Sequence, residues 1–150
     1  MQEEIKRNRI MLVGRSAAGK TTLLQRINNE ELKYHKTQTV HIVGNFGIDT
    51  PGEYLERRYF RGALMVTSTD ADIIVLVQDP TEGGTMFPPN YGSTFPKPKV
   101  GVVTKIDIAS AEEIEQAEKF LRAAGADEIF KISSVTGDGV EELVDRLQIL

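Results

Sequence analysis

The sequence contains no cysteine, no long run of apolar residues and no surplus of positive charge. Without cysteine, disulfide bonds and thiolate metal sites are excluded, and a reducing compartment is permitted. No apolar run approaches the length that a helix needs to cross a bilayer, and the first residues lack the apolar core of a secretory signal. We therefore expect a soluble, cytoplasmic protein with no membrane partner.

Charge and histidine content exclude two further classes of function. The formal net charge is −4 and the lysines and arginines form no stripe, so we expect no nucleic-acid partner. His35 and His41 are too isolated to suggest a metal site.

The 150 residues are 40% hydrophobic, which is enough for one core. Residues 1–150 are therefore expected to form a single domain.

Residues 14–21 carry the strongest indication of chemistry in the chain. Their sequence, GRSAAGKT, fits the pattern G-x-x-x-x-G-K-[ST] of a phosphate-binding loop, or P-loop. The loop follows an apolar run at 10–13 and opens into a stretch with helical apolar spacing. A glycine loop between a strand and a helix N-terminus directs backbone N–H groups at an anion. The predicted phosphate-binding residues are Gly14, Ser16, Ala17, Ala18, Gly19, Lys20, Thr21 and Thr22.

Strand-like and helix-like segments alternate along the rest of the chain. Later strands are predicted at 40–43, 46–48, 72–77, 100–103 and 128–132. Helices are predicted at 59–67, from the capping box of Ser110 and Glu113 to about 124, and from about 140 onward. This alternation predicts an α/β fold with a doubly wound, mainly parallel sheet flanked by helices. In such folds ligands bind at the carboxyl ends of the strands.

Two further segments would lie at those strand ends. In Asp49-Thr50-Pro51-Gly52 the carboxylate can hold Mg²⁺ through water, and the N–H of Gly52 can face a γ-phosphate. In Thr104-Lys105-Ile106-Asp107 the carboxylate can accept two hydrogen bonds from guanine, which adenine cannot supply. The stem of Lys105 can cover the flat face of the base. The alternative for both segments is an ordinary polar turn.

The last strand is followed by Ser133-Ser134-Val135. A backbone N–H of this segment could meet the O6 atom of guanine. Taken alone, the segment would be interpreted as a serine-rich turn. It gains weight only from its position after a strand.

Together these segments, in this order, resemble the P-loop GTPases over nearly the whole chain. A closer resemblance is to the EutP/PduV family, carried by Lys36-Thr37-Gln38, by residues 48–56 (IDTPGEYLE) and by Phe87-Pro88. Members of that family accompany ethanolamine and propanediol utilisation and bacterial microcompartments. The resemblance implies a small-GTPase-like fold, and association with a microcompartment.

The GTPase resemblance also implies roles for individual residues. Lys20 would neutralise the β- and γ-phosphates, and Thr21 would coordinate Mg²⁺ beside Asp49. Thr37 is the best candidate for a switch threonine that closes on Mg²⁺ and the γ-phosphate. Thr39 is the second candidate, and a solvated loop is the alternative for both. The implied cofactors are GTP or GDP with Mg²⁺, the implied metal residues are Thr21, Thr37 and Asp49, and the catalytic candidates are Lys20, Thr37 and Glu53.

Three departures from the GTPase pattern argue against rapid turnover. Glu53 stands where many GTPases place the glutamine that orients water, and its carboxylate could act as a base or face solvent. Ser16 replaces a glycine that is common in small GTPases. Only 11 residues separate Thr37 from Asp49, so the hairpin between the switch regions must be contracted.

The segment 80–99 is rich in proline and contains several aromatic residues. A connection of this length is uncommon unless it has a function or packs on itself. Its apolar side chains could dock a partner, or they could fold back over the edge of the sheet. The sequence does not decide between these alternatives.

Three functions follow from the sequence and its resemblances. The first is a guanine-nucleotide-binding protein, a slow GTPase or switch tied to a microcompartment. The second is an acetate-kinase-like phosphotransferase, in which Arg15 or Arg57 would bind the carboxylate of the acceptor. The third is an accessory protein that binds a shell or enzyme partner and holds nucleotide only as a structural ligand.

Overall fold

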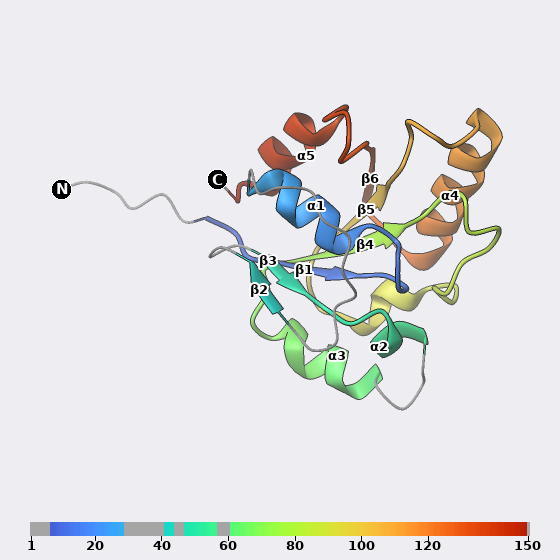
Figure 1. Ribbon diagram of the computed structural model, residues 1–150. Coiled ribbons are helices and arrows are strands. Elements are labelled where there is room, and N and C mark those ends of the chain that lie inside the picture. The colour runs from blue at the N-terminus through green and yellow to red at the C-terminus, as the bar shows by residue number, and fades with distance from the viewer. Residues whose placement is uncertain (1–6, 29–40, 44–46, 57–60, 150) are drawn as a thin grey trace.

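A six-stranded sheet forms the centre of the computed structural model, which describes residues 7–28, 41–43, 47–56 and 61–149. The side chains at 41–43, 53 and 61 are outside this description. The strands lie in the order β2-β3-β1-β4-β5-β6 (Figure 1). Their bounds are β1 Ile10–Val13, β2 His41–Val43, β3 Gly47–Asp49, β4 Ile73–Gln78, β5 Lys99–Val103 and β6 Glu128–Lys131.

All strands except β2 run parallel to one another. β1 lies between β3 and β4, with Leu12 opposite Asp49 on one side and Val75 on the other. β4 pairs with β5 and β5 with β6, also in parallel. β2 and β3 form a short antiparallel hairpin in which Val43 lies opposite Gly47. The predicted doubly wound, mainly parallel sheet and its contracted hairpin are confirmed.

Helices cover both faces of the sheet. α1 (Lys20–Ile27) and α5 (Val140–Leu147) pack on one face, and α2 (Glu53–Glu56), α3 (Arg61–Ser68) and α4 (Ala111–Ala124) contribute to the core on the other (Figure 1). β1 supplies both cores, because alternate residues of a strand point to opposite faces. Ile10 and Leu12 join the α1 side, while Met11 and Val13 join the α3 side. This two-sided burial explains why β1 and the first five residues of β4 are apolar throughout.

Helix α4 begins and ends as its sequence predicts. The side chain of Ser110 accepts a hydrogen bond from the N–H of Glu113, and the side chain of Glu113 accepts one from the N–H of Ser110. The helix ends at Gly125, whose φ of 100° is a left-handed conformation that glycine adopts without steric cost. α2, in contrast, is a single turn that the sequence did not predict.

The aromatic residues of segment 80–99 belong to the core on the α3 side. Phe87, Tyr91 and Phe95 are all at least nine-tenths buried. The ring of Tyr91 lies 5.5 Å from each of the other two, measured between centroids. A short 3₁₀ helix, Tyr91–Thr94, holds this arrangement. Of the two alternatives for these aromatic side chains, the structure supports packing against the sheet.

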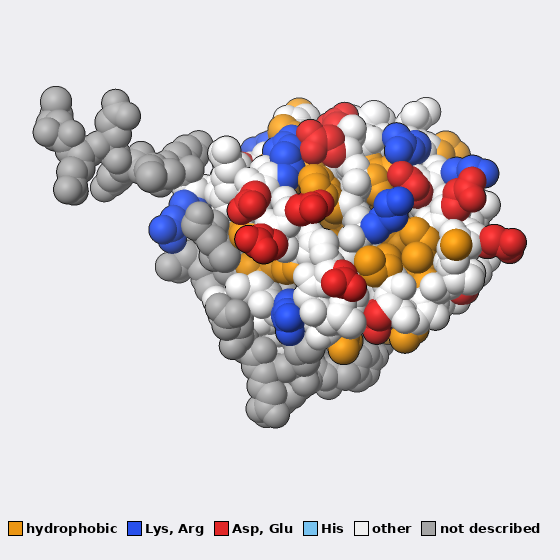
Figure 2. Space-filling model, turned by 90° about the horizontal axis from the view of Figure 1, so that it is seen from above, with side chains coloured by type: hydrophobic (Ala, Val, Ile, Leu, Met, Phe, Trp, Pro, Cys, Tyr) orange, Lys and Arg blue, Asp and Glu red, His pale blue; other side chains and the backbone are white. Residues whose placement is uncertain are grey.

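The surface of the described part mixes both signs of charge. On the face seen in Figure 2, acidic and basic side chains alternate around apolar areas. No helix in the described ranges combines the length and the apolar character required to cross a membrane.

The parallel strands end at one common edge, and the predicted site segments follow them there. The P-loop follows β1, Thr50 follows β3, Thr104 follows β5, and Ser133 lies two residues beyond β6. The chain reverses its direction of winding at β1, which lies between β3 and β4. A crevice at this switch point is where a doubly wound sheet binds its ligand.

Candidate functional site

The P-loop has a shape that only small residues permit. A Cβ atom added to Gly14 would lie 2.6 Å from the carbonyl oxygen of Val77, which is closer than real contacts allow. Gly19 and Ala17 adopt positive φ angles of 109° and 65°. The loop leads directly into α1, whose first N–H groups have no acceptor within the helix. An anion at this end of the helix would accept hydrogen bonds from these groups.

Lys20, the first residue of α1, turns its side chain back into the P-loop. Its ammonium group donates to the carbonyl oxygens of Gly14, at 2.6 Å, and Arg15, at 2.9 Å. Burial lowers the pKa of Lys20 to about 8, and the charges of Asp49 and Glu56 oppose this shift. The P-loop therefore holds a buried cation that is compensated by carbonyl dipoles and nearby carboxylates.

Two of the predicted metal residues contact each other beside this cation. The hydroxyl of Thr21 donates a hydrogen bond to the carboxylate of Asp49, a fully buried residue at the end of β3. The next residue, Thr50, donates through its hydroxyl to the carbonyl oxygen of Leu12, at 2.7 Å, which ties this segment to β1. A hydroxyl and a carboxylate are oxygen ligands suited to Mg²⁺. An ion of this kind commonly completes its shell with phosphate oxygens and water.

The turn after β3 lies directly against the P-loop. A Cβ atom added to Gly52 would come within 2.1 Å of the nitrogen of Ser16, so only glycine fits this approach. The N–H of Ser16 donates to the carboxylate of Glu56 in α2, at 2.8 Å. The sequence predicted the proximity of Gly52 to the phosphate loop. It did not predict the contact of Glu56.

A cavity adjoins the P-loop, formed by the segments after β5 and β6. Its volume is about 270 Å³, and it is lined by Gly19, Thr22, Thr104, Lys105, Asp107, Ile108, Ser134 and Val135. The buried hydroxyl of Thr104 donates to the carbonyl oxygen of Ala18, at 2.7 Å, which fixes this segment against the P-loop. Ile108 and Val135 are 69% and 64% exposed, and a planar ring in the cavity would cover them.

The structure brings together most of the predicted base-binding residues. Lys105, Asp107, Ser134 and Val135 line the cavity. Ser133 is fully buried and stabilises the turn instead: its hydroxyl accepts from the N–H of Thr136, at 3.1 Å. Ser133 therefore supports the cavity wall without lining it.

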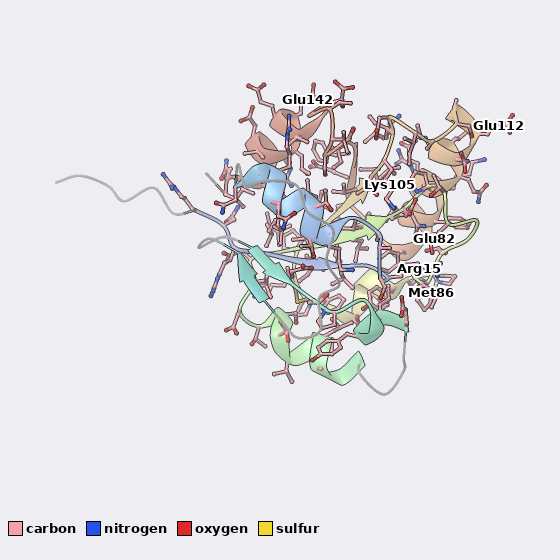
Figure 3. All side chains as sticks on the ribbon, in the orientation of Figure 1. Arg15, Glu82, Met86, Lys105, Glu112 and Glu142 are labelled. Atoms are coloured by element: carbon pink, nitrogen blue, oxygen red, sulfur yellow. The ribbon has the colours of Figure 1, made fainter. Side chains whose placement is uncertain are left out.

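The loop at residues 78–85, which begins with the last residue of β4, connects the candidate phosphate and base segments. Asp79 accepts from the ammonium of Lys105, at 2.7 Å, and Lys105 also donates to the carbonyl oxygen of Ala17, at 2.8 Å. Glu82 accepts from Arg15 of the P-loop, at 2.7 Å. In Figure 3 the labelled Arg15, Glu82 and Lys105 gather on the side of the sheet where the strands end. The 78–85 loop thus contacts both candidate binding segments.

Hydrogen bonds within the 78–85 loop hold these carboxylates in place. The buried amide of Gln78 donates to the carbonyl oxygens of Asp79 and Gly84, at 3.0 Å each, and to the carboxylate of Glu82. The hydroxyl of Thr85 donates to the side-chain oxygen of Gln78, at 2.7 Å. Burial tends to raise the pKa of Asp79, but hydrogen bonds from Lys105 and Thr81 outweigh it and keep this pKa below its ordinary value.

Several predicted site residues lie outside the described part of the chain. They are Thr37 and Thr39, the two candidate switch threonines, together with Arg57 and the side chain of Glu53. Their roles stay predictions.

The geometry and the comparisons with known proteins define the class. A strand–P-loop–helix unit at the switch point of a doubly wound sheet makes this chain a P-loop protein with the fold of the GTPases. Among solved structures, elongation factor SelB from Methanococcus maripaludis, in complex with the GTP analogue GPPNHP, matches with a TM-score of 0.69. The match has 23% sequence identity and covers 97% of this chain and 34% of that one.

The family follows from the sequence comparisons. Residues 7–149 match the model of the PduV-EutP family, described as ethanolamine utilisation - propanediol utilisation. The propanediol utilization protein PduV of Citrobacter freundii is 42% identical over 90% of this chain and 89% of that protein. The probable acetate kinase EutP of Escherichia coli is 31% identical over 95% of this chain and 90% of that protein. The chain belongs to the PduV-EutP family.

Sequence reasoning missed Asp79, Glu82 and Glu56. Asp79 offered a usable indication, because it directly follows a buried strand, as the other site segments do. Glu82 and Glu56 offered none. They reach P-loop residues that lie 67 and 40 positions away, and nothing in the local sequence marks such contacts.

The Asp79–Lys105 contact predicts a measurable contribution to stability. In Asp79→Asn the carboxylate charge is lost while a similar shape remains. The free energy of unfolding should fall by about 1.5–3 kcal/mol at neutral pH, the usual range for a hydrogen bond to a charged group. A carboxyl whose pKa is lowered by folding stabilises at pH values above its unfolded pKa, and this stabilisation is lost as the pH falls through the folded pKa.

Urea unfolding of both proteins tests this, with the exposed Asp145→Asn as the matched control. The difference between wild type and Asp79→Asn should be full at neutral pH, should begin to decline near the ordinary carboxyl value of 3.8, and should be lost as the pH falls through the lower folded pKa. Equal stabilities of the two proteins at neutral pH would show that the contact stabilises nothing.

Proposed function

We propose that this protein binds guanine nucleotide with Mg²⁺ and acts as a slow GTPase or nucleotide switch. The observation that carries the proposal is the convergence of three segments at one edge of the sheet. These are the P-loop with Lys20, the Thr21–Asp49 pair, and the cavity lined by Lys105 and Asp107. Along the sheet edge, Asp49 at the end of β3 and the cavity after β5 lie on opposite sides of the P-loop, as the metal-binding end and the base of a nucleoside phosphate would require.

In this proposal each described segment has a specific task. The N–H groups of the P-loop and the ammonium of Lys20 bind the phosphates, exchanging the carbonyl acceptors of Lys20 for phosphate oxygens. Thr21 and Asp49 would hold Mg²⁺, which supplies charge neutralisation at the phosphates. Asp107 accepts hydrogen bonds from guanine while Lys105, Ile108 and Val135 flank the ring. Membership of the PduV-EutP family supports a role in ethanolamine or propanediol utilisation and association with a microcompartment.

The second candidate is phosphoryl transfer to acetate, which is favoured by the relative described as a probable acetate kinase. That reaction needs a cation for the acceptor's carboxylate. Arg15 already pairs with Glu82, whose hydrogen bond raises the pKa of the guanidinium above its ordinary value. Arg15 is therefore less suited to that role than the sequence alone suggested. Transfer of the γ-phosphate to acetate, measured directly, would select this candidate.

Calorimetric titration with GTP, GDP, ATP and ADP, each with and without Mg²⁺, tests the main proposal. Tight, Mg²⁺-dependent binding of the guanine nucleotides alone is expected. Equal binding of ATP and GTP would remove Asp107 as a base reader, and binding of none of the four would remove the whole proposal.

The buried ammonium of Lys20 predicts a pH dependence of binding. Its pKa of about 8 should rise when phosphates replace the carbonyl acceptors, so binding above pH 8 requires uptake of a proton. Affinity should therefore decline as the pH rises past about 8, which lies well above the second phosphate ionisation near pH 6. Lys20→Ala should weaken binding by at least about ten- to a hundred-fold and abolish the alkaline decline.

Titrations between neutral pH and about two units above it, in buffers of different ionisation enthalpy, measure this proton uptake directly. Lys119→Ala on the exposed face of α4 is the control. An unchanged affinity in Lys20→Ala would mean that the phosphates bind elsewhere.

The proposed base site predicts a change of specificity in Asp107→Asn. An amide can donate to the 2-oxo group of xanthine, where a carboxylate can only accept. The variant should lose GTP affinity by several orders of magnitude, as a site with mismatched polar groups does, and should gain affinity for XTP. Competition between the two nucleotides checks this prediction. Preference for GTP in the variant would assign base recognition to other residues.

Turnover by the purified protein should be slow. Intrinsic GTPase rates are on the order of 10⁻⁴ to 10⁻² s⁻¹, and an arginine from a partner can raise them by about 10³- to 10⁵-fold. Arg15 is held by Glu82, so we expect a rate near the low end of this range. Single-turnover hydrolysis over a range of protein concentrations measures it. A fast rate that is independent of concentration would mean that a catalytic group in this chain has been missed.

A further inference from the structure

The contact between Glu56 and the P-loop has a consequence for which nucleotide the site accepts. The carboxylate of Glu56 receives the N–H of Ser16 at 2.8 Å, within the loop that would surround the phosphates. A carboxylate is itself an anion, so it competes with a phosphate for N–H donors and for positive charge. The position is unusual because the rest of the loop's chemistry attracts anions.

The fold holds this carboxylate in place. α2 is a single turn in which the N–H groups of Leu55 and Glu56 donate to the carbonyl oxygen of Gly52, at 3.1 Å each. Leu55 is buried in the core on the α3 side, and Gly52 rests against Ser16. The backbone N–H of Glu56 is therefore held by the carbonyl oxygen of Gly52, and its carboxylate is held by the N–H of Ser16.

The electrostatic effect of Glu56 on the P-loop cations also shows that its carboxylate lies close to them. The carboxylate of Glu56 acts on the ammonium of Lys20 and on the guanidinium of Arg15, and in both cases it raises the pKa of the cation. A γ-phosphate bound to Lys20 would lie within the range of the same carboxylate. The two negative groups would repel each other, and the repulsion would be strong because the surroundings are partly buried.

We infer that Glu56 is a selectivity residue that disfavours a terminal γ-phosphate and so sets the preference of this site for diphosphate over triphosphate. The inference rests on the proposed function and adds a specific regulator to it. Binding of a triphosphate must displace Glu56 from Ser16. That movement would pull on the same turn that carries Gly52, next to the metal residue Asp49. The protein would thus respond to the γ-phosphate because this phosphate displaces the charged carboxylate of Glu56.

The charge-neutral variant Glu56→Gln separates this role from a structural one. Its amide oxygen can still accept the N–H of Ser16, so α2 keeps its contact while the charge disappears. We expect the affinity for the non-hydrolysable analogue GPPNHP to rise by about tenfold, the change that follows from removing one partly screened charge contact. The GDP affinity should stay within about twofold, since a diphosphate places no γ-phosphate beside Glu56.

Calorimetric titration of wild type and variant with GPPNHP and GDP, in Mg²⁺, gives the ratio of the two affinities. Glu142→Gln on α5 is the matched control, since this glutamate is exposed and lies away from Arg15 in Figure 3. Thermal unfolding verifies that each variant is folded. Glu56→Ala, which also removes the charge, must shift the ratio in the same direction if the charge is the cause.

An increased ratio of GPPNHP affinity to GDP affinity in both Glu56 variants supports the inference. A ratio equal to that of wild type, or a lower one, overturns it, because Glu56 would then be neutral toward the γ-phosphate or would help to bind it. These outcomes leave the proposed function intact, since wild type binds both ligands in each case. If wild type binds neither ligand, the proposed function fails, and the inference fails with it.

Discussion

Burial of the Lys20 ammonium is the constraint around which the rest of the site is arranged. A cation that is only 5% exposed needs acceptors, and the P-loop supplies two of its own carbonyl oxygens. Those carbonyls can reach the ammonium only because the loop turns tightly through Gly14 and Gly19. The carboxylates of Asp49 and Glu56 lie close enough to support the charge. The shape of the P-loop, the candidate metal residue Asp49 and α2 thus satisfy one electrostatic requirement.

The same requirement determines how an anion could enter the site. Lys20 is compensated by carbonyls, Arg15 by Glu82 and the N–H of Ser16 by Glu56. A phosphate therefore exchanges partners with groups already present, and its net binding energy is a difference between two satisfied states. Small changes in one internal partner can then shift the balance between related ligands. Such a site can discriminate between ligands even though each of its contacts is individually strong.

Coupling between the phosphate and base regions follows from the 78–85 loop. Its carboxylates reach Arg15 and Lys105, while Thr104 and Lys105 bond to the P-loop backbone directly. A displacement of the P-loop would strain these contacts, because the amide of Gln78 holds the loop rigidly at the end of β4. The cavity lined by Lys105 and Asp107 and the P-loop thus form one connected unit.

Much of this could be predicted from the sequence, because the elements involved have local signatures. The P-loop pattern, the apolar strands and the capping box of Ser110 each depend on neighbouring residues, and the alternation of strands and helices indicates a doubly wound, mainly parallel sheet. The contacts of Glu56 and Glu82 depend on which loops meet at the sheet edge. The sequence also could not show whether the aromatic side chains of segment 80–99 pack against the sheet or face a partner, because an apolar side chain suits a core and an interface alike.

The unpredicted contacts share one physical feature, which explains why they could not be predicted from the sequence. Each joins a carboxylate that follows one strand to a donor that follows another strand, and carboxylates are common in solvated loops throughout the chain. Only the parallel sheet, by bringing its strand ends to one edge, gives Glu56, Asp79 and Glu82 a cation or an N–H group to bind. The sequence motifs identify the groups that attract a phosphate. The fold adds carboxylates that would compete with it, and under the proposed function the balance between the two sets would determine which phosphate the site prefers.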